Sequence, residues 1–222
     1  MISGRRSFHR ASEAERRQDL IAATLDCIAE FGLQGATVRQ IAARAGVTGG
    51  LIRHYFDGKD QMVQAAYRET MTGMTAMAIN AANEAGGDAR SRFRSFIVAN
   101  LTPPITDPRT LSLWGAFISQ IRVDPEFAAI HRDNYQAFIA ALEALIAAFL
   151  REVGRAESAA DSRRQAIAIS GLVDGLWLEA SLAGDMFADS ELPSIALATI
   201  ESILGLPAGD LSHSSITGKD KE

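Results

Sequence analysis

The sequence predicts an all-α protein of nine helices, and three observations support that fold class. Apolar residues recur at spacings of three and four along most of the chain, which is the period of a helix with one buried face. The sequence lacks alternating runs of β-branched residues, and Asn-Gly or Asp-Gly turns between such runs, so strands are not expected. Glycine and proline residues divide the chain into segments of helical length.

The first two helices are marked by their capping and stop residues. A stripe of apolar residues over 13–31 predicts the first helix, and Gly32 supplies a left-handed stop after it. Thr37 and Gln40 have the spacing of a capping box, which begins a second helix with the sequence VRQIAARA. Gly46 ends that helix. A short helix, a glycine turn and a further helical segment therefore follow one another closely.

The remaining helices are predicted from the same signals. Thr48 is placed to cap a third helix, GGLIRHYF, and Lys59 begins a long fourth helix, which the segment EAGGD at 84–88 ends. Pro108 and Pro125 suit the first turns of the sixth and seventh helices, because a helix needs no N–H from its first residue. The ranges expected for the fifth to ninth helices are 88–101, 108–121, 125–153, 161–182 and 190–204.

Composition places the chain among globular proteins. Hydrophobic residues make up 47% and charged residues 22% of 222 residues, which is not the composition of a disordered chain. A single cysteine, Cys27, excludes an internal disulfide framework and fits a reducing compartment. Four scattered histidines show no metal-ligand spacing, and no metal or cofactor is expected. Without a long apolar run or a secretion signal, we expect a cytoplasmic protein and no membrane span.

Charge is distributed unevenly along the chain. The net charge is −5, but residues 1–60 hold nine basic and seven acidic residues, a net of +2, so the remainder carries −7. A nucleic-acid partner needs only a local basic face, since phosphate contacts are screened within about 8 Å at physiological salt. The distribution allows a basic head on an acidic body.

The segment TVRQIAARAGVTGGLIRHYF has the signature of a helix-turn-helix unit, two short helices joined by a tight glycine turn. Ala42 is small where the helices must cross, and Leu51 and Ile52 seat the second helix on the core. The start of such a recognition helix enters the DNA major groove. Two glycines there allow the backbone of the helix to approach DNA closely. The residues expected to face DNA are Thr48, Gly49, Gly50, Arg53 and His54.

Residues around this unit are expected to complete a DNA interface. Arg53 is the candidate for a bidentate contact to guanine or phosphate. A two-fold dimer would read a palindrome with half-sites about 34–36 Å apart or a multiple of that. We expect a DNA-binding domain over 1–60, a ligand-binding and dimerisation domain over 61–205, and a disordered tail over 206–222. The residues expected to hold phosphates are Arg16, Arg17, Thr37 and Lys59, with Arg5, Arg6 and Arg10 forming an arm along a groove.

This unit resembles the TetR family of transcriptional regulators. The resemblance adds Tyr55 to the residues expected at the DNA surface. Arg53 departs from the family pattern, because most members carry tyrosine there, and an arginine replaces that contact with a guanidinium. The matching residues are Thr37, Ile41-Ala42, Ala45-Gly46-Val47-Thr48, Gly50, His54-Tyr55-Phe56 and Lys59.

Later segments resemble one branch of that family. Three segments are similar to those of BetI, the branch of repressors that control choline and glycine-betaine genes. They are VTGGLIRHYFDGK, TLSLWGAFISQI and LVDGLWLEASLAGD. The resemblance implies an Ω-shaped homodimer with a DNA-binding head and a ligand-binding body in each subunit. It also implies a small-molecule effector, choline-like in chemistry, that releases the repressor from its operator.

Aromatic residues of the sixth to eighth helices allow two interpretations. Large aromatic residues commonly fill a core. They also form cages for quaternary ammonium groups, held by cation–π attraction. Asp174 stands one turn before the second tryptophan on an apolar face, where it either neutralises a bound cation or pairs with an arginine of its own subunit. The candidate ligand-binding residues are Trp114, Phe117, Tyr135, Asp174 and Trp177.

Small residues on the eighth helix suggest an interface between subunits. Gly171 and Gly175 are four residues apart and therefore share a face with Leu178. They let a second helix approach closely, either within the same bundle or at a dimer seam. The family resemblance favours a seam formed by the eighth and ninth helices of both subunits.

An enzymatic function is not supported by any motif in the sequence. The GxSxG elbow, the P-loop, the HExxH motif and the dinucleotide fingerprint are all absent. The alternative from another class is a helical ligand-binding or interaction protein that does not bind DNA. The Arg53 departure is the single observation that favours it.

Overall fold

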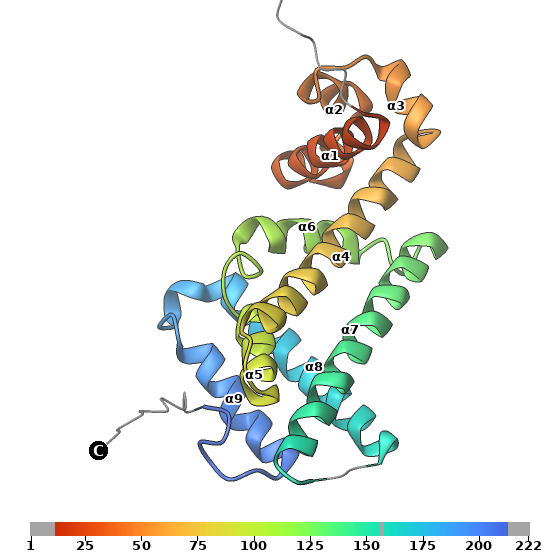
Figure 1. Ribbon diagram of the computed structural model, residues 1–222. Helices are drawn as coiled ribbons and strands as arrows, with labels where there is room; N and C mark the ends of the chain where they lie inside the picture. The colour runs from red at the N-terminus through yellow and green to blue at the C-terminus, as the bar shows by residue number, and fades with distance from the viewer. Residues whose placement is uncertain (1–11, 156–157, 213–222) are drawn as a thin grey trace, which may run out of the picture.

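The computed structural model describes residues 12–155 and 158–212, and these residues contain nine α-helices and no strand (Figure 1). The predicted fold class is confirmed. None of the described helices combines the length and apolar character needed to cross a membrane. The α-helices are α1 (Glu13–Gly35), α2 (Val38–Arg44), α3 (Gly49–Phe56), α4 (Lys59–Glu84), α5 (Ala89–Asn100), α6 (Pro108–Ile118), α7 (Pro125–Glu152), α8 (Ala159–Ala183) and α9 (Glu191–Leu204), with a 3-10 turn at Gly184–Met186.

Capping residues start the helices of the head where the sequence predicts. The Thr37 hydroxyl accepts from the Gln40 backbone N–H and the Gln40 side chain accepts from the Thr37 N–H, which completes the expected capping box of α2. Thr48 occupies the N-cap position of α3, but its side chain caps no backbone group. Gly32 has a positive φ of 69° and interrupts α1, although the helical turns resume and continue to Gly35.

The end of α6 was predicted three residues too late. The helix ends at Ile118, and residues 119–123 form consecutive turns instead of a last helical turn. The Asp124 N–H is bonded to the Gln120 carbonyl, while the Asp124 side chain accepts from the Glu126 N–H and begins α7. The capping of the following helix therefore sets this boundary.

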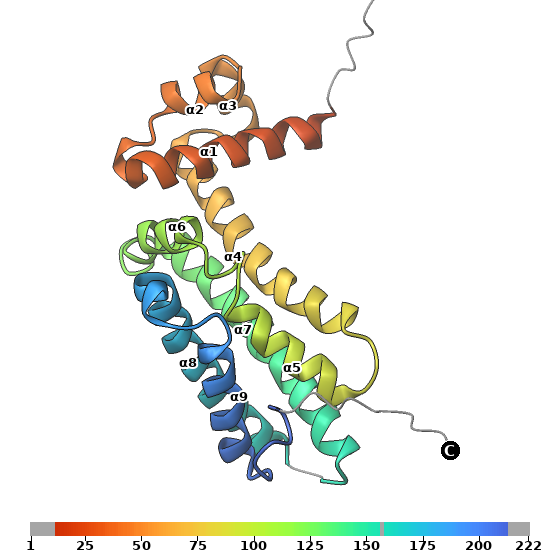
Figure 2. The same ribbon diagram turned by 90° about the vertical axis from the view of Figure 1, so that its left-hand side faces the viewer.

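The molecule consists of a small helical head on a longer helical body. In Figure 2, α2 and α3 lie at the far end of the head, and α1 lies between them and α6 of the body. Helix α4 leaves the head and runs down beside α5 and α7 (Figure 1). An ion pair of 2.5 Å between Arg109 on α6 and Asp26 on α1 joins the two parts at the surface.

Two clusters of buried side chains correspond to the head and the body, but the head cluster extends beyond residue 60. It includes α4 residues as far as Tyr67, together with Phe117 of α6 and Phe127 and Ile130 of α7. The division of the chain at residue 60 stays a prediction. Head and body share packed side chains at this junction, so a movement of one part displaces side chains of the other.

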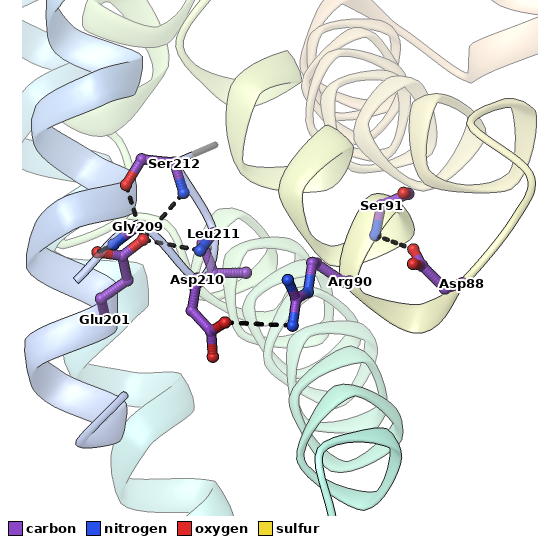
Figure 3. A network of polar contacts seen from close by, with 8 residues as sticks. All are labelled: Asp88, Arg90, Ser91, Glu201, Gly209, Asp210, Leu211 and Ser212. Carbon is purple, nitrogen blue, oxygen red and sulfur yellow. Dashed lines mark hydrogen bonds and ion pairs between the residues drawn. The ribbon is translucent and has the colours of Figure 1, made fainter. Parts of the chain in front are cut away.

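The prediction of a disordered tail from residue 206 is wrong for residues 206–212, and residues 213–222 lie outside the described residues. Leu211 is fully buried, and Glu201 of α9 accepts hydrogen bonds from the backbone N–H groups of Gly209, Leu211 and Ser212 (Figure 3). Asp210 pairs with Arg90 of α5 at 3.2 Å. A buried carboxylate without partners is costly, so this segment folds back to satisfy it.

Candidate nucleic-acid interface and ligand cavity

The helix-turn-helix unit, formed by α2 and α3, lies at the end of the head (Figure 2). Gly46 makes the turn with a positive φ of 64°, and Ile41, Ala42 and Ile52 are buried where α2 and α3 meet α1 and α4. Tyr55 and Lys59 are partly buried. The exposed members of the predicted surface are Arg17, Thr37, Thr48, Gly49, Gly50, Arg53 and His54.

The two glycines that begin α3 are not required by the fold of the single chain. A Cβ added at Gly49 would lie 3.8 Å from Val38 and one at Gly50 would lie 3.9 Å from Thr48, which are ordinary van der Waals distances. Neither glycine has a positive φ. Each costs about 1 kcal/mol of helix propensity relative to alanine, with no gain inside the chain. Their absence of side chains leaves the start of α3 open to an external partner.

Three basic residues of the predicted surface differ in their surroundings. The exposed Arg53 has no hydrogen bond or ion pair with any residue in the described part of the chain. The Lys59 ammonium donates to the Leu33 carbonyl at 3.2 Å and so ties the start of α4 to the end of α1. The Arg17 guanidinium lies 4.9 Å from the centroid of the Phe56 ring, a cation–π contact. Lys59 and Arg17 thus stabilise the head as well.

The remaining basic candidates for the DNA interface lie in the first helix, in the N-terminal arm and in α2. Arg16 is partly buried, and the expected arm of Arg5, Arg6 and Arg10 lies outside the described residues. Sequence reasoning missed Arg39, which is exposed in the first turn of α2. Its place two residues after the Thr37 cap was the available signal.

A cavity of about 340 Å³ lies in the body between α4, α6, α7 and α8, with Asn100 at the end of α5 also in its wall. Four of the five predicted ligand-binding residues line it, although they come from three different helices. Its size is at the small end of the range for small-molecule sites. The lining residues are Met71, Met74, Thr75, Asn100, Trp114, His131, Asn134, Tyr135, Phe138, Ser170, Asp174, Gly175, Trp177 and Leu178.

The two tryptophans form a fixed corner of this cavity. Trp114 and Trp177 meet edge to face, with ring centroids 5.3 Å apart and an interplanar angle of 70°. The Trp177 indole N–H donates to the Ile105 carbonyl at 2.9 Å, so the buried ring is held in one orientation. Tyr135 is 39% exposed and stands at the open side of the cavity. Rings held in this way are pre-organised for a ligand.

Asp174 is the one formally charged side chain, apart from the titratable His131, among the residues that line the cavity. Within residues 12–155 and 158–212, no hydrogen bond or ion pair reaches its carboxylate, so the expected arginine partner is not found there. The side chain is open to solvent in the single chain, yet the surrounding protein removes part of its hydration and raises the pKa of the carboxyl. A bound cation would offset this cost.

The prediction for Phe117 is wrong. Its ring is fully buried in the head cluster, 5.0 Å from the Tyr67 ring centroid and 6.1 Å from that of Phe127, and it does not line the cavity. Trp114 and Phe117 are three residues apart on α6. That helix crosses the junction of head and body, so neighbouring turns contribute to different clusters.

Sequence reasoning missed most of the cavity wall contributed by α4 and α7. Met74 belongs to the apolar stripe of α4, which was the available signal for that wall. His131 is also part of this wall: it is partly buried, and its Nδ1 lies 3.2 Å from the Tyr67 hydroxyl. Burial lowers the pKa of His131, so the ring is neutral at neutral pH.

Two of the three predicted interface residues of α8 lie on an open face, while Leu178 is partly buried against the body core. Gly171 and Gly175 are exposed, and a Cβ added to either would meet no atom within 4 Å. Gly175 and Leu178 also line the cavity, so one edge of the cavity coincides with this face. Large apolar side chains that are exposed along α8 and α9 are Ile167 at 43%, Leu182 at 65% and Ile195 at 43%.

Comparisons with known proteins identify the family to which the chain belongs. The model of the bacterial regulatory proteins of the tetR family matches residues 20–66, and that of the C-terminal domain of BetI-type transcriptional repressors matches residues 89–205. The chain belongs to the TetR family of DNA-binding transcriptional repressors and carries a BetI-type C-terminal domain. It is a regulator and not an enzyme. The resemblance seen in the sequence is confirmed.

Individual relatives agree with this placement. The BetI regulator of Stenotrophomonas maltophilia is 30% identical over 85% of this chain and 93% of its own length. A crystal structure of a transcriptional regulator from Pseudomonas aeruginosa PAO1 is 34% identical, covers 90% of this chain and 95% of its own, and has a TM-score of 0.79. A regulator from Saccharomonospora viridis, crystallised in complex with choline, shares the fold at 19% identity, with a TM-score of 0.71 over 85% of this chain and 97% of its own.

Proposed function

We propose that this repressor binds a palindromic operator as a homodimer and is released from it by a small organic cation of the choline type. Because its target is operator DNA, it acts in the cytoplasm. The alternative of a helical protein without DNA-binding activity rested on the Arg53 departure alone. The match of residues 20–66 to the tetR family model favours DNA binding over this alternative.

The recognition helix of the proposed interface is α3. Arg53 is exposed there without a partner in the described chain, so its guanidinium is free to bond a guanine edge or a phosphate. Gly49 and Gly50 leave room for DNA at the start of the helix. Thr37, Thr48 and His54 flank this surface and contact the phosphate backbone.

The proposed dimer uses the open face of α8 and α9. A two-fold interface presents the same patch of both subunits to one another. Gly171 allows close approach of the helices, while Ile167, Leu182 and Ile195 bury their exposed apolar side chains against the partner subunit. Such a face also contributes the Gly175 edge of the cavity.

The observation that carries the effector assignment is the carboxylate of Asp174 in an aromatic cavity, with no basic partner among the described residues. Trp114, Tyr135 and Trp177 offer ring faces to the methyl groups of a quaternary ammonium, and Asp174 supplies the counter-charge. The complex of the Saccharomonospora viridis regulator with choline supports this chemistry for a protein of the same fold.

Release from DNA requires that the ligand prefer one shape of the dimer, because equal affinity for two shapes shifts neither. Helix α4 belongs to both parts of the subunit, with Tyr67 in the head cluster and Met71 and Met74 in the cavity wall. A ligand that moves the cavity end of α4 therefore changes the orientation of the head and the spacing of the two recognition helices.

The experiment is operator binding, followed by fluorescence anisotropy, with choline added. Choline is expected to weaken binding by the wild type about 5- to 150-fold, which corresponds to a coupling of about 1–3 kcal/mol. Asp174→Asn should bind the operator normally and lose the response. The neutral isostere of choline, with carbon in place of nitrogen, is the matched control ligand. No response of the wild type to choline would overturn the effector assignment.

A further inference from the structure

A hydrogen bond joins the wall of the ligand cavity to the core of the head. The Tyr67 hydroxyl of α4 lies 3.2 Å from Nδ1 of His131 on α7, and His131 is a lining residue of the cavity. Tyr67 is only 1% exposed and does not line the cavity itself. The two ends of this bond thus belong to different parts of the molecule.

Both groups are neutral at neutral pH, so the bond responds to position and not to charge. Burial raises the pKa of Tyr67 to about 12, which keeps the phenol protonated, and burial lowers the pKa of His131. In one tautomer of the imidazole the phenol donates to Nδ1, and in the other Nδ1–H donates to the phenol oxygen. Displacing the ring leaves a buried phenol without its partner, which costs free energy.

On the side of the head, Tyr67 is packed between aromatic rings. Its ring stacks on that of Phe127 with centroids 5.2 Å apart, and the Phe117 centroid lies 5.0 Å away. The same cluster contains Leu20 and Ile21 of α1 and Ile52 of the recognition helix. Because such a core is close-packed, a shift of Tyr67 cannot be absorbed locally.

We propose that His131 is the positioning residue through which the cavity and the recognition helices communicate, with its hydrogen bond to Tyr67 as the link between them. This inference rests on the proposed function. A ligand in the cavity displaces the His131 ring, Tyr67 moves with it, and α4 and the aromatic cluster transmit the change to α1 and α3. By reciprocity, operator binding must change the affinity of the cavity for its ligand by the same factor, and this link carries that effect back from the head.

The other side-chain hydrogen bonds between α4 and α7 do not offer this path. Arg68 pairs with Glu126 at the surface at 3.0 Å, with both side chains half exposed. Thr72 donates to Asn134 at 3.3 Å in an exposed position, and Thr72 belongs to neither core cluster. These contacts fasten the two helices together without reaching the core of the head.

The test uses DNA as the perturbation and needs no effector. The chain has two tryptophans, and both line the cavity, so its tryptophan emission reports on the cavity alone. A palindromic duplex enriched from a random pool by binding to the wild-type dimer is titrated in. Anisotropy of the labelled duplex measures binding, and tryptophan emission measures the response of the cavity.

Operator binding is expected to change the tryptophan emission of the wild type, and Tyr67→Phe is expected to bind the same duplex while losing that change. His131→Leu removes the other partner of the hydrogen bond and should also bind the duplex without the change in emission. This variant keeps the test decisive if Tyr67→Phe folds poorly. Arg68→Gln, which removes the surface pair, is the control and should keep the full change.

The outcomes separate two kinds of failure. Wild-type protein that enriches no duplex would contradict the proposed function itself. Wild-type protein that binds DNA without any change in emission would overturn the link between His131 and Tyr67. A Tyr67→Phe variant with the full wild-type change would overturn it as well.

Discussion

Trp114 on α6 and Trp177 on α8 meet edge to face across one corner of the cavity, with ring centroids 5.3 Å apart. The same α6 carries Arg109, which pairs with Asp26 of α1 in the head. The Trp177 indole is in turn anchored to the Ile105 carbonyl. One of the two helices that build this aromatic corner, α6, therefore also contacts the head, as a ligand-responsive switch requires.

Replacing Arg53 with alanine is expected to weaken operator binding by about 1–3 kcal/mol if the guanidinium makes a bidentate contact to guanine. The side chain has no partner in the described chain, so stability should not change. Electrophoretic mobility shifts with wild-type and base-substituted operators measure both affinity and discrimination. A uniform loss across all sequences would assign Arg53 to a phosphate, and an unchanged affinity would remove it from the interface.

Gly50→Ala separates the role of the glycine in folding from its role in DNA binding. The added Cβ lies 3.9 Å from the nearest atom, and alanine is favoured in a helix by about 1 kcal/mol, so the thermal stability should hold or rise. Operator affinity should fall, because the methyl group occupies the space left for DNA. Calorimetry and anisotropy on the same preparations check this. Lower stability, or full affinity, would contradict the close-approach explanation.

Leu182→Glu is expected to weaken the dimer at least tenfold, or by about 1.4 kcal/mol. Its side chain is 65% exposed in the single chain and belongs to the proposed α8 and α9 face, where a two-fold axis would bring two carboxylates together. Gly175 is a less clean site for this test, because it also lines the cavity. Sedimentation measures the dimer, and Val123→Glu, at a 73% exposed turn, is the control. Equal dimerisation of both variants would place the interface elsewhere.

The buried carboxylate of Glu201 predicts a pH-dependent contribution to stability. Burial opposes its ionisation, but hydrogen bonds from the Ser212 hydroxyl and from the backbone N–H groups of Gly209, Leu211 and Ser212 outweigh this and lower its pKa from 4.5 to about 2. A lowered pKa stabilises the fold above about pH 4.5, and the contribution is lost as the pH falls toward 2.

Glu201→Gln should therefore be less stable than the wild type at neutral pH, and the difference should shrink as the pH falls below 4.5. Thermal melts of both proteins across this range measure the difference. Asp210→Asn removes the more exposed pair with Arg90 and is the control. A difference independent of pH would show that the carboxylate does not hold the segment 206–212.

Local signals predicted the helices well because capping chemistry is encoded over three or four residues. Thr37 with Gln40, and Asp124 before Pro125, fixed helix starts that the structure reproduces. The composition of the α8 stripe likewise drew attention to Asp174, since a carboxylate on an apolar face needs a reason. Its position in the cavity wall agrees with the prediction, while its role stays a proposal.

The remaining features of the site could not be predicted, because they depend on packing between residues far apart in the sequence. Sequence spacing does not reveal which turn of α6 faces which cluster, so Trp114 and Phe117 were given the same role and only one lines the cavity. The bond between Tyr67 and His131 joins residues far apart in the chain, and no local pattern indicates it. Glu201 carried a usable signal, because it interrupts the apolar stripe of α9 as Asp174 interrupts that of α8.

The most direct measurement is a calorimetric titration of choline into the wild type and into Asp174→Asn. A saturable heat is expected from the wild type, with affinity at least tenfold weaker in the variant, because Asp174 provides the counter-charge beside Trp114 and Trp177. Operator DNA should weaken choline binding by the same factor by which choline weakens operator binding. No heat from the wild type, or equal affinity in the two proteins, would contradict a cation site in this cavity.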